Sequence, residues 1–336
     1  MPGEEKPVSR GGSKEALQLD SSFRRQFSDL DSECNSPISP EYKKPCQTII
    51  FFDWDDTLFP TEELIDRWGL SVGERAELTD PPLTAEQAQL LSEWQDALCA
   101  YLEEACTLSG RCVILTNSKR PWVEDSVARF VPQLSSFFRI KARTDSLKIV
   151  YGQELLEMQI NELQPRRHNK NHEATPDELQ ERLTLAKFIA MRKEVTDFYS
   201  KYPRQTWKNI LSLGDMPYEK DAIQEVAHRR VAPRGRPETL RTKAIVVPRA
   251  PFMGEIAHRL RLGRVLLAAY VQYDGDIDLD LQRSPDPMAC LGRALNIDAL
   301  ARLPMSRHAW GSELTLDQDS IDREIKILRN AVYQTD

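Results

Sequence analysis

The chain has 336 residues, of which 40% are apolar and 29% are charged, and its formal net charge is −7 at pH 7. This length and apolar content fit one large domain with appendages or two small domains. The mild negative charge gives no electrostatic case for nucleic acid as a partner. The longest apolar run, near 265–271, is too short to cross a bilayer, so no membrane is expected either. The six cysteines show no zinc-type spacing, which favours a reducing, cytoplasmic location.

Residues 1–46 are rich in Ser, Pro, Gly and charged residues and contain few large apolar ones. Such a segment cannot bury enough apolar surface to order itself, so we predict a disordered tail. Ser28 follows a pair of arginines, as in sites of basophilic kinases, and Ser36 and Ser39 each precede a proline, as in proline-directed sites. Kinases are therefore expected partners of this tail, although an inert tail explains such short patterns equally well.

Beyond the tail, apolar runs typical of buried strands alternate with segments of helical periodicity. Strands are predicted at 47–53, 111–116, 137–142, 209–214 and 242–247, with an acidic edge strand near 274–281. Helices are predicted at 84–108, 122–130, 187–199, 219–229 and 252–273. A last apolar stripe predicts a terminal helix that docks on the domain or on a partner; its residues are Ile321, Ile325, Leu328 and Val332.

This alternation predicts the α/β class, with a parallel sheet wrapped by helices. The domain is expected to span 47–282, with a polar insert at about 144–182 and a C-terminal extension over 283–336. The segment after the first strand, 58–83, leaves room for a short flap only. The sequence therefore predicts a minimal cap over the carboxyl ends of the strands.

The first predicted strand ends in three acids within four positions, Asp53, Asp55 and Asp56. Carboxylates are costly inside a core, so we expect them at the strand's carboxyl end, facing the crevice where open α/β sheets bind ligands. Two carboxylates two residues apart, beside the Thr57 hydroxyl, suit covalent phosphoryl transfer. One attacks phosphorus and the other handles the proton of the leaving group. The alternative is a strand capped by a solvated acidic turn.

Further polar residues follow the later strands. The second strand ends in Thr116 and Asn117, the fourth ends in Gly214 and Asp215, and lysines crowd the preceding helix. This ordered set resembles the haloacid dehalogenase superfamily of phosphohydrolases over about residues 47–250. Within it, the stretch Phe-Phe-Asp-Trp-Asp-Asp-Thr-Leu-Phe-Pro is similar to a eukaryotic branch. The resemblance implies a Rossmann-like sheet with the strand order 3-2-1-4-5.

The resemblance also implies a role for each residue. Asp53 is expected to be the nucleophile that forms an aspartyl-phosphate, and Asp55 the general acid and then the base that activates water. Thr116 is expected to hydrogen-bond a transferring phosphoryl oxygen. The implied cofactor is Mg²⁺, held by Asp53, Asp215 and the backbone carbonyl of Asp55. Such a sparse set of oxygen ligands is what Mg²⁺ prefers.

Two expected phosphate contacts are Thr57 and Asn117. Glu219 stands four residues after Asp215, where the superfamily more usually has an aspartate. The longer side chain keeps the charge, so we expect Glu219 to orient the lysine or a metal-bound water.

A cation is needed to neutralise phosphoryl charge and to restrain the nucleophile. Lys187 is the first choice because it is one cation on an otherwise apolar helical stretch, which predicts that it points inward. Lys208, directly before the fourth strand, is placed at the wrong end of the sheet and ranks second. Lys193 and Arg192 also remain possible. For each of them the alternative is a solvated helix face.

These features together predict a Mg²⁺-dependent phosphatase. Its substrate is expected to be a phosphorylated small molecule or protein, and the minimal cap is compatible with a bulky one. The main alternative is a catalytically quiet phosphate-binding or scaffold protein with the same fold. Transfer of the phosphoryl group to an acceptor other than water also remains open.

Overall fold

The computed structural model describes residues 41–73, 80–163, 175–201, 207–230, 239–301 and 318–333. All of them belong to one compact unit, Glu41–Asp336. The predicted kinase sites at Ser28, Ser36 and Ser39 lie outside the described residues. The predicted end of the tail at residue 46 is wrong, because two short 3-10 helices, Glu41–Lys43 and Pro45–Gln47, precede the first strand. Tyr42 is buried there.

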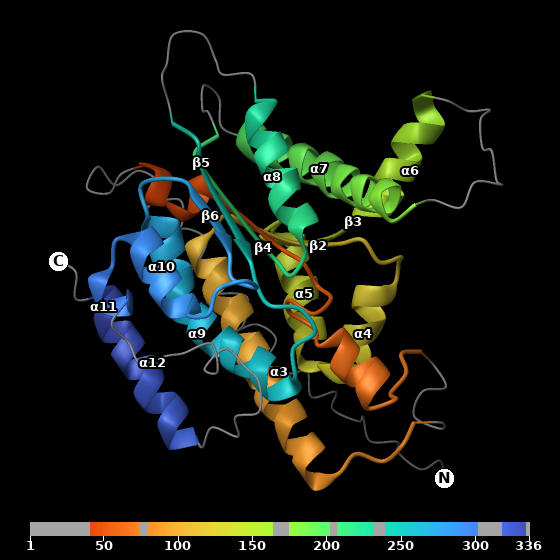
Figure 1. Ribbon diagram of the computed structural model, residues 1–336. Helices are drawn as coiled ribbons and strands as arrows, with labels where there is room; N and C mark the ends of the chain where they lie inside the picture. The colour runs from red at the N-terminus through yellow and green to blue at the C-terminus, as the bar shows by residue number, and fades with distance from the viewer. Residues whose placement is uncertain are drawn as a thin grey trace, which may run out of the picture. The chain divides into compact units, whose positions relative to one another are not determined.

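A six-stranded parallel sheet forms the centre of the unit, with the order β3-β2-β1-β4-β5-β6 (Figure 1). This confirms the predicted α/β class and the order 3-2-1-4-5, to which β6 adds one edge. The acids of that edge strand face solvent, as predicted, since Asp278 and Asp280 are exposed. The strands are β1 Thr48–Phe52, β2 Arg111–Thr116, β3 Leu147–Tyr151, β4 Asn209–Gly214, β5 Arg241–Val246 and β6 Ile277–Asp280.

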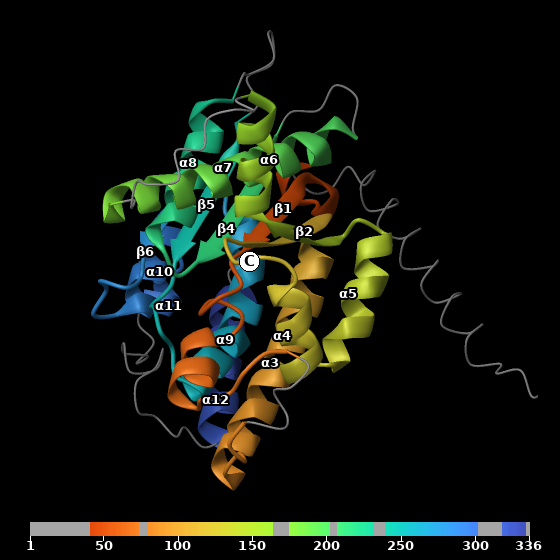
Figure 2. The same ribbon diagram turned by 90° about the vertical axis from the view of Figure 1, so that its right-hand side faces the viewer.

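Helices cover both faces of this sheet. Figures 1 and 2 show α7 and α8 on one side and α3, α4, α5 and α9 on the other. The helices are α3 Ala85–Leu108, α4 Trp122–Phe130, α5 Gln133–Arg143, α6 Gly152–Leu163, α7 Pro176–Ser200, α8 Pro217–His228, α9 Met253–Gln272, α10 Pro287–Leu295, α11 Asp298–Ala301 and α12 Gln318–Tyr333, with a π-helical turn η3 at Glu62–Arg67.

The position of β1 in the sheet explains why its sequence is an almost unbroken apolar run. Ile50 and Phe52 point into the core beneath α3 and α9, whereas Ile49 and Phe51 point into the core beneath α7 and α8. All four side chains are at most 1% exposed. Because neighbouring side chains of a strand point to opposite faces, a strand buried on both faces needs an apolar residue at every position.

The third strand is not where the sequence predicted it. Residues 137–142 belong to α5, and the strand is β3 at Leu147–Tyr151. Leu134, Phe137 and Phe138 are spaced three and four residues apart and pack together on the core, which is helical spacing. The predicted polar insert at 144–182 therefore contains β3, α6 and the start of α7, while residues 164–174 lie outside the described part.

Helix α7 begins earlier than the predicted residue 187. Thr175 caps it, accepting a hydrogen bond from the backbone of Glu178 while the Glu178 carboxylate accepts one from the backbone of Thr175. Pro176 occupies the first turn, where its missing N–H costs nothing. This start places Lys187 in the middle of a long helix that packs across β1 and β2.

The C-terminal segment packs against the same core as the sheet. Leu291, Leu295, Leu328 and Val332 all belong to the core on the α3 and α9 side, and α12 packs on α9. The predicted docking of the terminal stripe on the domain is thus confirmed for the residues whose side chains are described. Residues 283–301 and 318–333 are part of this compact unit.

Cysteines and helix lengths bear on the predicted location. Cys99, Cys106, Cys112 and Cys290 are free thiols, whereas Cys46 is disulfide-bonded. No helix within the described ranges is long and apolar enough to cross a membrane.

Two neighbouring residues of α12 test how firmly this helix is docked. Leu328 is fully buried, whereas Ile327 is 45% exposed. We predict that Leu328→Ala lowers the free energy of unfolding by about 2–5 kcal/mol, because it leaves a cavity, and that Ile327→Ala costs well under about 1 kcal/mol. Urea denaturation followed by circular dichroism measures both. Equal losses would contradict the docking of α12 on the core.

Candidate active site

The predicted site residues lie at the carboxyl ends of three adjacent strands. Asp53 follows β1, Thr116 ends β2 and Asp215 follows β4, and β1 pairs with both other strands in parallel. A cleft of about 720 Å³ opens there. Its lining residues are Asp53, Asp55, Asp56, Thr61, Asn117, Ser118, Lys119, Trp122, Asp215, Met216 and Tyr218.

Lys187 is the buried cation of this site. Its Nζ lies 2.6 Å from Asp53 Oδ1 and 2.9 Å from Glu219 Oε1, and it also donates to the carbonyl of Leu115. Burial alone would lower the pKa of this amine, but Asp53 and then Glu219 outweigh it and raise the pKa above its usual value. The side chain is therefore a permanent positive charge against the carboxylate of Asp53.

The two rival lysines lie elsewhere. The side chain of Lys193 is 61% exposed, and its Nζ lies 3.8 Å from Glu194 Oε1. Lys208, directly before β4 at the opposite end of the sheet, pairs with Glu41. Of these three lysines, only Lys187 reaches the carboxylates at the strand ends.

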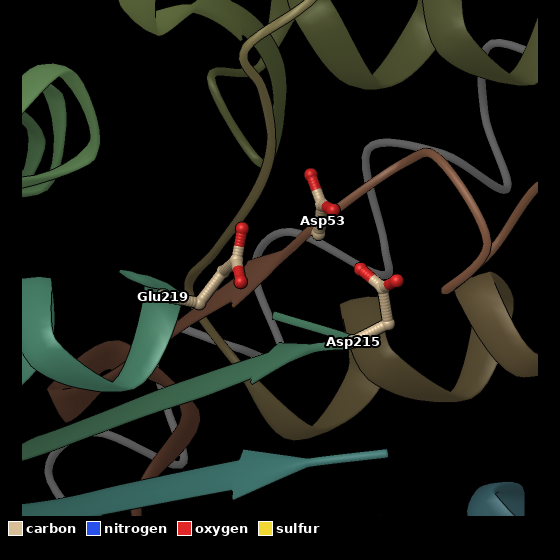
Figure 3. Close-up of side chains that lie close together, drawn as sticks. All are labelled: Asp53, Asp215 and Glu219. Carbon is tan, nitrogen blue, oxygen red and sulfur yellow. The ribbon is translucent and has the colours of Figure 1, made fainter. Parts of the chain in front are cut away.

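Three carboxylates gather at one point beside that lysine. An oxygen from each of Asp53, Asp215 and Glu219 lies within 4.8 Å of the other two (Figure 3). Glu219 is held at the start of α8, where its second oxygen accepts a hydrogen bond from the backbone N–H of Met216 at 3.2 Å. A Cβ on Gly214 would lie 2.5 Å from the Glu219 side chain, so glycine at this position leaves room for the carboxylate.

Burial and mutual repulsion keep protons on this cluster. They raise the pKa of Asp215 to about 9, with burial the larger cause and Asp53 the next. The pKa of Glu219 rises to about 8 for the same first reason, against the opposing effect of Lys187. Burial likewise raises the pKa of Asp53, although Lys187 opposes it. Three carboxylates facing one ammonium are short of positive charge, and oxygen ligands of this kind suit a hard divalent cation.

Asp55 lies in a different environment from Asp53. Its Oδ1 accepts hydrogen bonds from the Thr61 hydroxyl and the Trp122 indole, both at 2.7 Å. Its Oδ2 accepts from the hydroxyls of Ser118 at 2.9 Å and Thr116 at 3.1 Å. The Thr116 hydroxyl, expected from the sequence to contact a phosphoryl oxygen, thus donates to Asp55 in this structure.

Three of the four donors to Asp55 were not predicted from the sequence: Ser118, Thr61 and Trp122. Ser118 directly follows Thr116 and Asn117, so the run of polar residues at the strand end was a usable signal. Thr61 and Trp122 lie in a turn and at the start of a helix, where nothing in their spacing indicates a shared partner.

The remaining predicted residues line or underlie the cleft. Thr57 is 5% exposed, and within the described part of the chain its hydroxyl has no hydrogen-bond partner. Asn117 lines the cleft, and its side-chain oxygen likewise lacks a partner there. Asp56 accepts a hydrogen bond from the backbone N–H of Glu62 at 3.1 Å and so caps η3. Burial raises the pKa of Asp56 to about 6.

No family model, curated protein or solved structure matches this chain. What the site can do therefore follows from its own residues. A carboxylate fixed by a buried ammonium, a second carboxylate two residues away, and an acidic cluster that could hold a metal ion face one open cleft. This arrangement can attack an electrophilic centre, move a proton beside it and bind a cation.

The raised pKa values predict an unusual pH dependence of stability. Asp215 and Glu219 keep their protons to about pH 9 and 8 in the folded chain, but ionise near pH 4 when unfolded. The folded state then binds more protons, so the free energy of unfolding without metal falls as pH rises from about 5 to about 9, by on the order of 1 kcal/mol per pH unit.

Millimolar Mg²⁺ should remove most of that loss, because a bound cation favours the ionised carboxylates. Thermal unfolding across this pH range, with Mg²⁺ or with a chelator, measures the effect. In Asp215→Asn, which cannot ionise at that position, both the fall with pH and the gain from Mg²⁺ should shrink. A wild-type stability that rises steadily to pH 9 without metal would contradict this electrostatic account.

Proposed function

We propose that this chain is a Mg²⁺-dependent phosphomonoester hydrolase of the haloacid dehalogenase type, acting through an aspartyl-phosphate at Asp53. One observation carries the proposal. The Asp53 carboxylate is held 2.6 Å from the buried ammonium of Lys187, next to Asp215, with Asp55 on the same cleft. This combination supplies a nucleophile, a compensating cation, a cation site and a proton carrier.

The reaction would run in two steps. Asp53 attacks phosphorus, the bond from phosphorus to the ester oxygen breaks, and Asp55 gives its proton to that oxygen, so an alcohol leaves. Water then attacks the phosphorus of the aspartyl-phosphate while Asp55 takes a proton from it. The bond between phosphorus and Asp53 breaks, inorganic phosphate leaves, and both carboxyl groups return to their initial states.

The other residues of the cleft would serve the phosphoryl group. Lys187 compensates its charge together with that of Asp53. Among the described residues, the Thr57 hydroxyl and the side-chain oxygen of Asn117 have no hydrogen-bond partner, although the Asn117 nitrogen donates to the carbonyl of Leu183 at 3.5 Å. The free Thr57 hydroxyl supports its expected role in phosphate binding. Ser118 and Thr116 hold Asp55.

Asp53 and Asp215 are the carboxylates that fit Mg²⁺, with the backbone carbonyl of Asp55 as a third ligand. Glu219 is better suited to holding Lys187 than to binding the metal, because it already pairs with Lys187 at 2.9 Å and accepts a hydrogen bond from the backbone of Met216. When bound, the ion would reduce the repulsion between an anionic nucleophile and an anionic phosphoryl group.

The cleft sets broad limits on the substrate. At about 720 Å³ and lined partly by the exposed Lys119, it admits a phosphorylated small molecule or a phosphorylated side chain of a protein. For location, the four free thiols agree with the expected cytoplasm, whereas the disulfide at Cys46 argues against a reducing compartment.

The proposal is tested by hydrolysis of p-nitrophenyl phosphate with Mg²⁺ and with a chelator. We expect activity with Mg²⁺ only, and a loss of at least about 100-fold in Asp53→Asn, which keeps the shape of the nucleophile and removes its charge. Asp66→Asn is the matched control, because Asp66 is an exposed acid of η3, and its rate should equal that of the wild type.

Each other outcome has a distinct meaning. Equal rates in the wild type and Asp53→Asn would defeat the enzyme assignment and favour the phosphate-binding scaffold. Loss of p-nitrophenyl phosphate without release of inorganic phosphate would instead indicate transfer to an acceptor other than water.

A further inference from the structure

The indole of Trp122 is bound directly to the proposed proton carrier. Trp122 is the first residue of α4, it lines the cleft, and its Nε1 donates to Asp55 Oδ1 at 2.7 Å. A hydrogen bond this short to a carboxylate is of the charge-assisted kind and is stronger than a neutral one. No strand-end pattern predicted it.

The ring of Trp122 is itself anchored. It meets the ring of Phe59 edge to face, with centroids 6.0 Å apart. Phe59 is fully buried and stacks on Trp54 at 5.5 Å, with the two rings nearly parallel. Backbone hydrogen bonds tie Phe59 to both Trp54 and Asp56, on either side of Asp55. The indole therefore shares one rigid aromatic support with the turn that carries Asp55.

The four donors to Asp55 fall into two pairs. Oδ1 accepts from Trp122 and Thr61, and Oδ2 accepts from Ser118 and Thr116. A hydroxyl can donate or accept and turns to suit its partner, whereas an indole N–H can only donate. A proton on Oδ1 would weaken the bond from Trp122, because a protonated oxygen is a poorer acceptor, and only the Thr61 hydroxyl could accept that proton. A proton on Oδ2 can be accepted by either of its two hydroxyl neighbours.

From this asymmetry we infer that Trp122 is a positioning residue: it fixes the plane of the Asp55 carboxylate through Oδ1 and leaves Oδ2, which has two hydroxyl neighbours, as the oxygen for proton transfer. The inference rests on the proposed function, because it assigns the oxygen that gives its proton to the leaving group and later takes one from water. Trp122 touches neither reacting atom in this scheme. It acts through Asp55, by fixing the carboxylate plane and the identity of the proton-carrying oxygen.

Two replacements of Trp122 isolate the N–H. Trp122→Phe keeps an aromatic ring against Phe59, and benzothienylalanine at this position keeps the full bicyclic shape with sulfur in place of the N–H. Trp94→Phe is the control, because its indole also donates a buried hydrogen bond, at 3.0 Å to the carbonyl of Leu58, but does not touch Asp55.

The test compares kcat/KM for p-nitrophenyl phosphate and for an alkyl phosphate, glycerol phosphate, with Mg²⁺. An alkoxide leaves poorly without a proton, whereas p-nitrophenolate needs little help. Both Trp122 replacements should lower the alkyl value by about 10- to 100-fold, the effect of one hydrogen bond to a charged group. The aryl value should fall by less than about 3-fold, and Trp94→Phe should leave the ratio unchanged.

A second measurement keeps Trp122 itself in place, so it does not depend on whether the Trp122 variants fold. In ¹H–¹⁵N spectra of the full chain, the indole resonance of Trp122 should move in Asp55→Asn, while that of Trp94 should not. An unmoved Trp122 resonance, or an alkyl-to-aryl ratio that Trp122→Phe leaves at the wild-type value, overturns this inference and leaves the proposed phosphatase standing. If the wild type hydrolyses neither ester, the proposed function fails and the inference falls with it.

Discussion

The buried ammonium of Lys187 is the interaction on which the site depends. Removing one charge from water costs several kcal/mol, and the structure offsets that cost by placing Asp53, Glu219 and the carbonyl of Leu115 around it. Those partners come from the end of β1 and the start of α8, and the lysine comes from the middle of α7. Three elements far apart in the sequence are thus fixed against one another at the rim of the sheet. Loss of the lysine would leave both carboxylates without compensation, whereas loss of one carboxylate would leave the lysine paired with the other.

One lysine does not balance the acids around it, and this remaining imbalance gives the site its chemistry. Asp215 and Asp56 stand near Asp53, and their pKa values are raised because burial penalises their charged forms. Such a cluster favours whatever brings positive charge, which is the physical basis for proposing Mg²⁺ there. Asp55 is supported differently, by four neutral donors. Two carboxylates two residues apart thereby lie in different surroundings, which is the basis for proposing separate tasks for them.

The sequence predicted most of the framework. Strand-end acids and runs of apolar residues gave the α/β class, the central strands and the convergence of Asp53, Asp215 and Lys187, because parallel strands place their carboxyl ends at one rim. It misplaced the third strand, because the apolar run around Phe137 and Phe138 resembles a strand. The real strand β3 lies at the edge of the sheet and carries a half-buried Lys148, so it is less apolar than a central strand. Contacts made by turns were beyond its reach. The bonds from Thr61 and Trp122 to Asp55 depend on where η3 and α4 begin relative to β1, which no local period encodes.

The central claim is that a metal ion joins the Asp53 and Asp215 carboxylates while Lys187 holds Asp53 from the other side. Crystals soaked in Mn²⁺, which takes the same oxygen ligands as Mg²⁺ and scatters anomalously, test it most directly. We expect one anomalous peak about 2.1 Å from an oxygen of each of Asp53 and Asp215, with the bond from Lys187 to Asp53 retained. A peak bound elsewhere, or a saturated soak with no peak between these two carboxylates, would contradict the account.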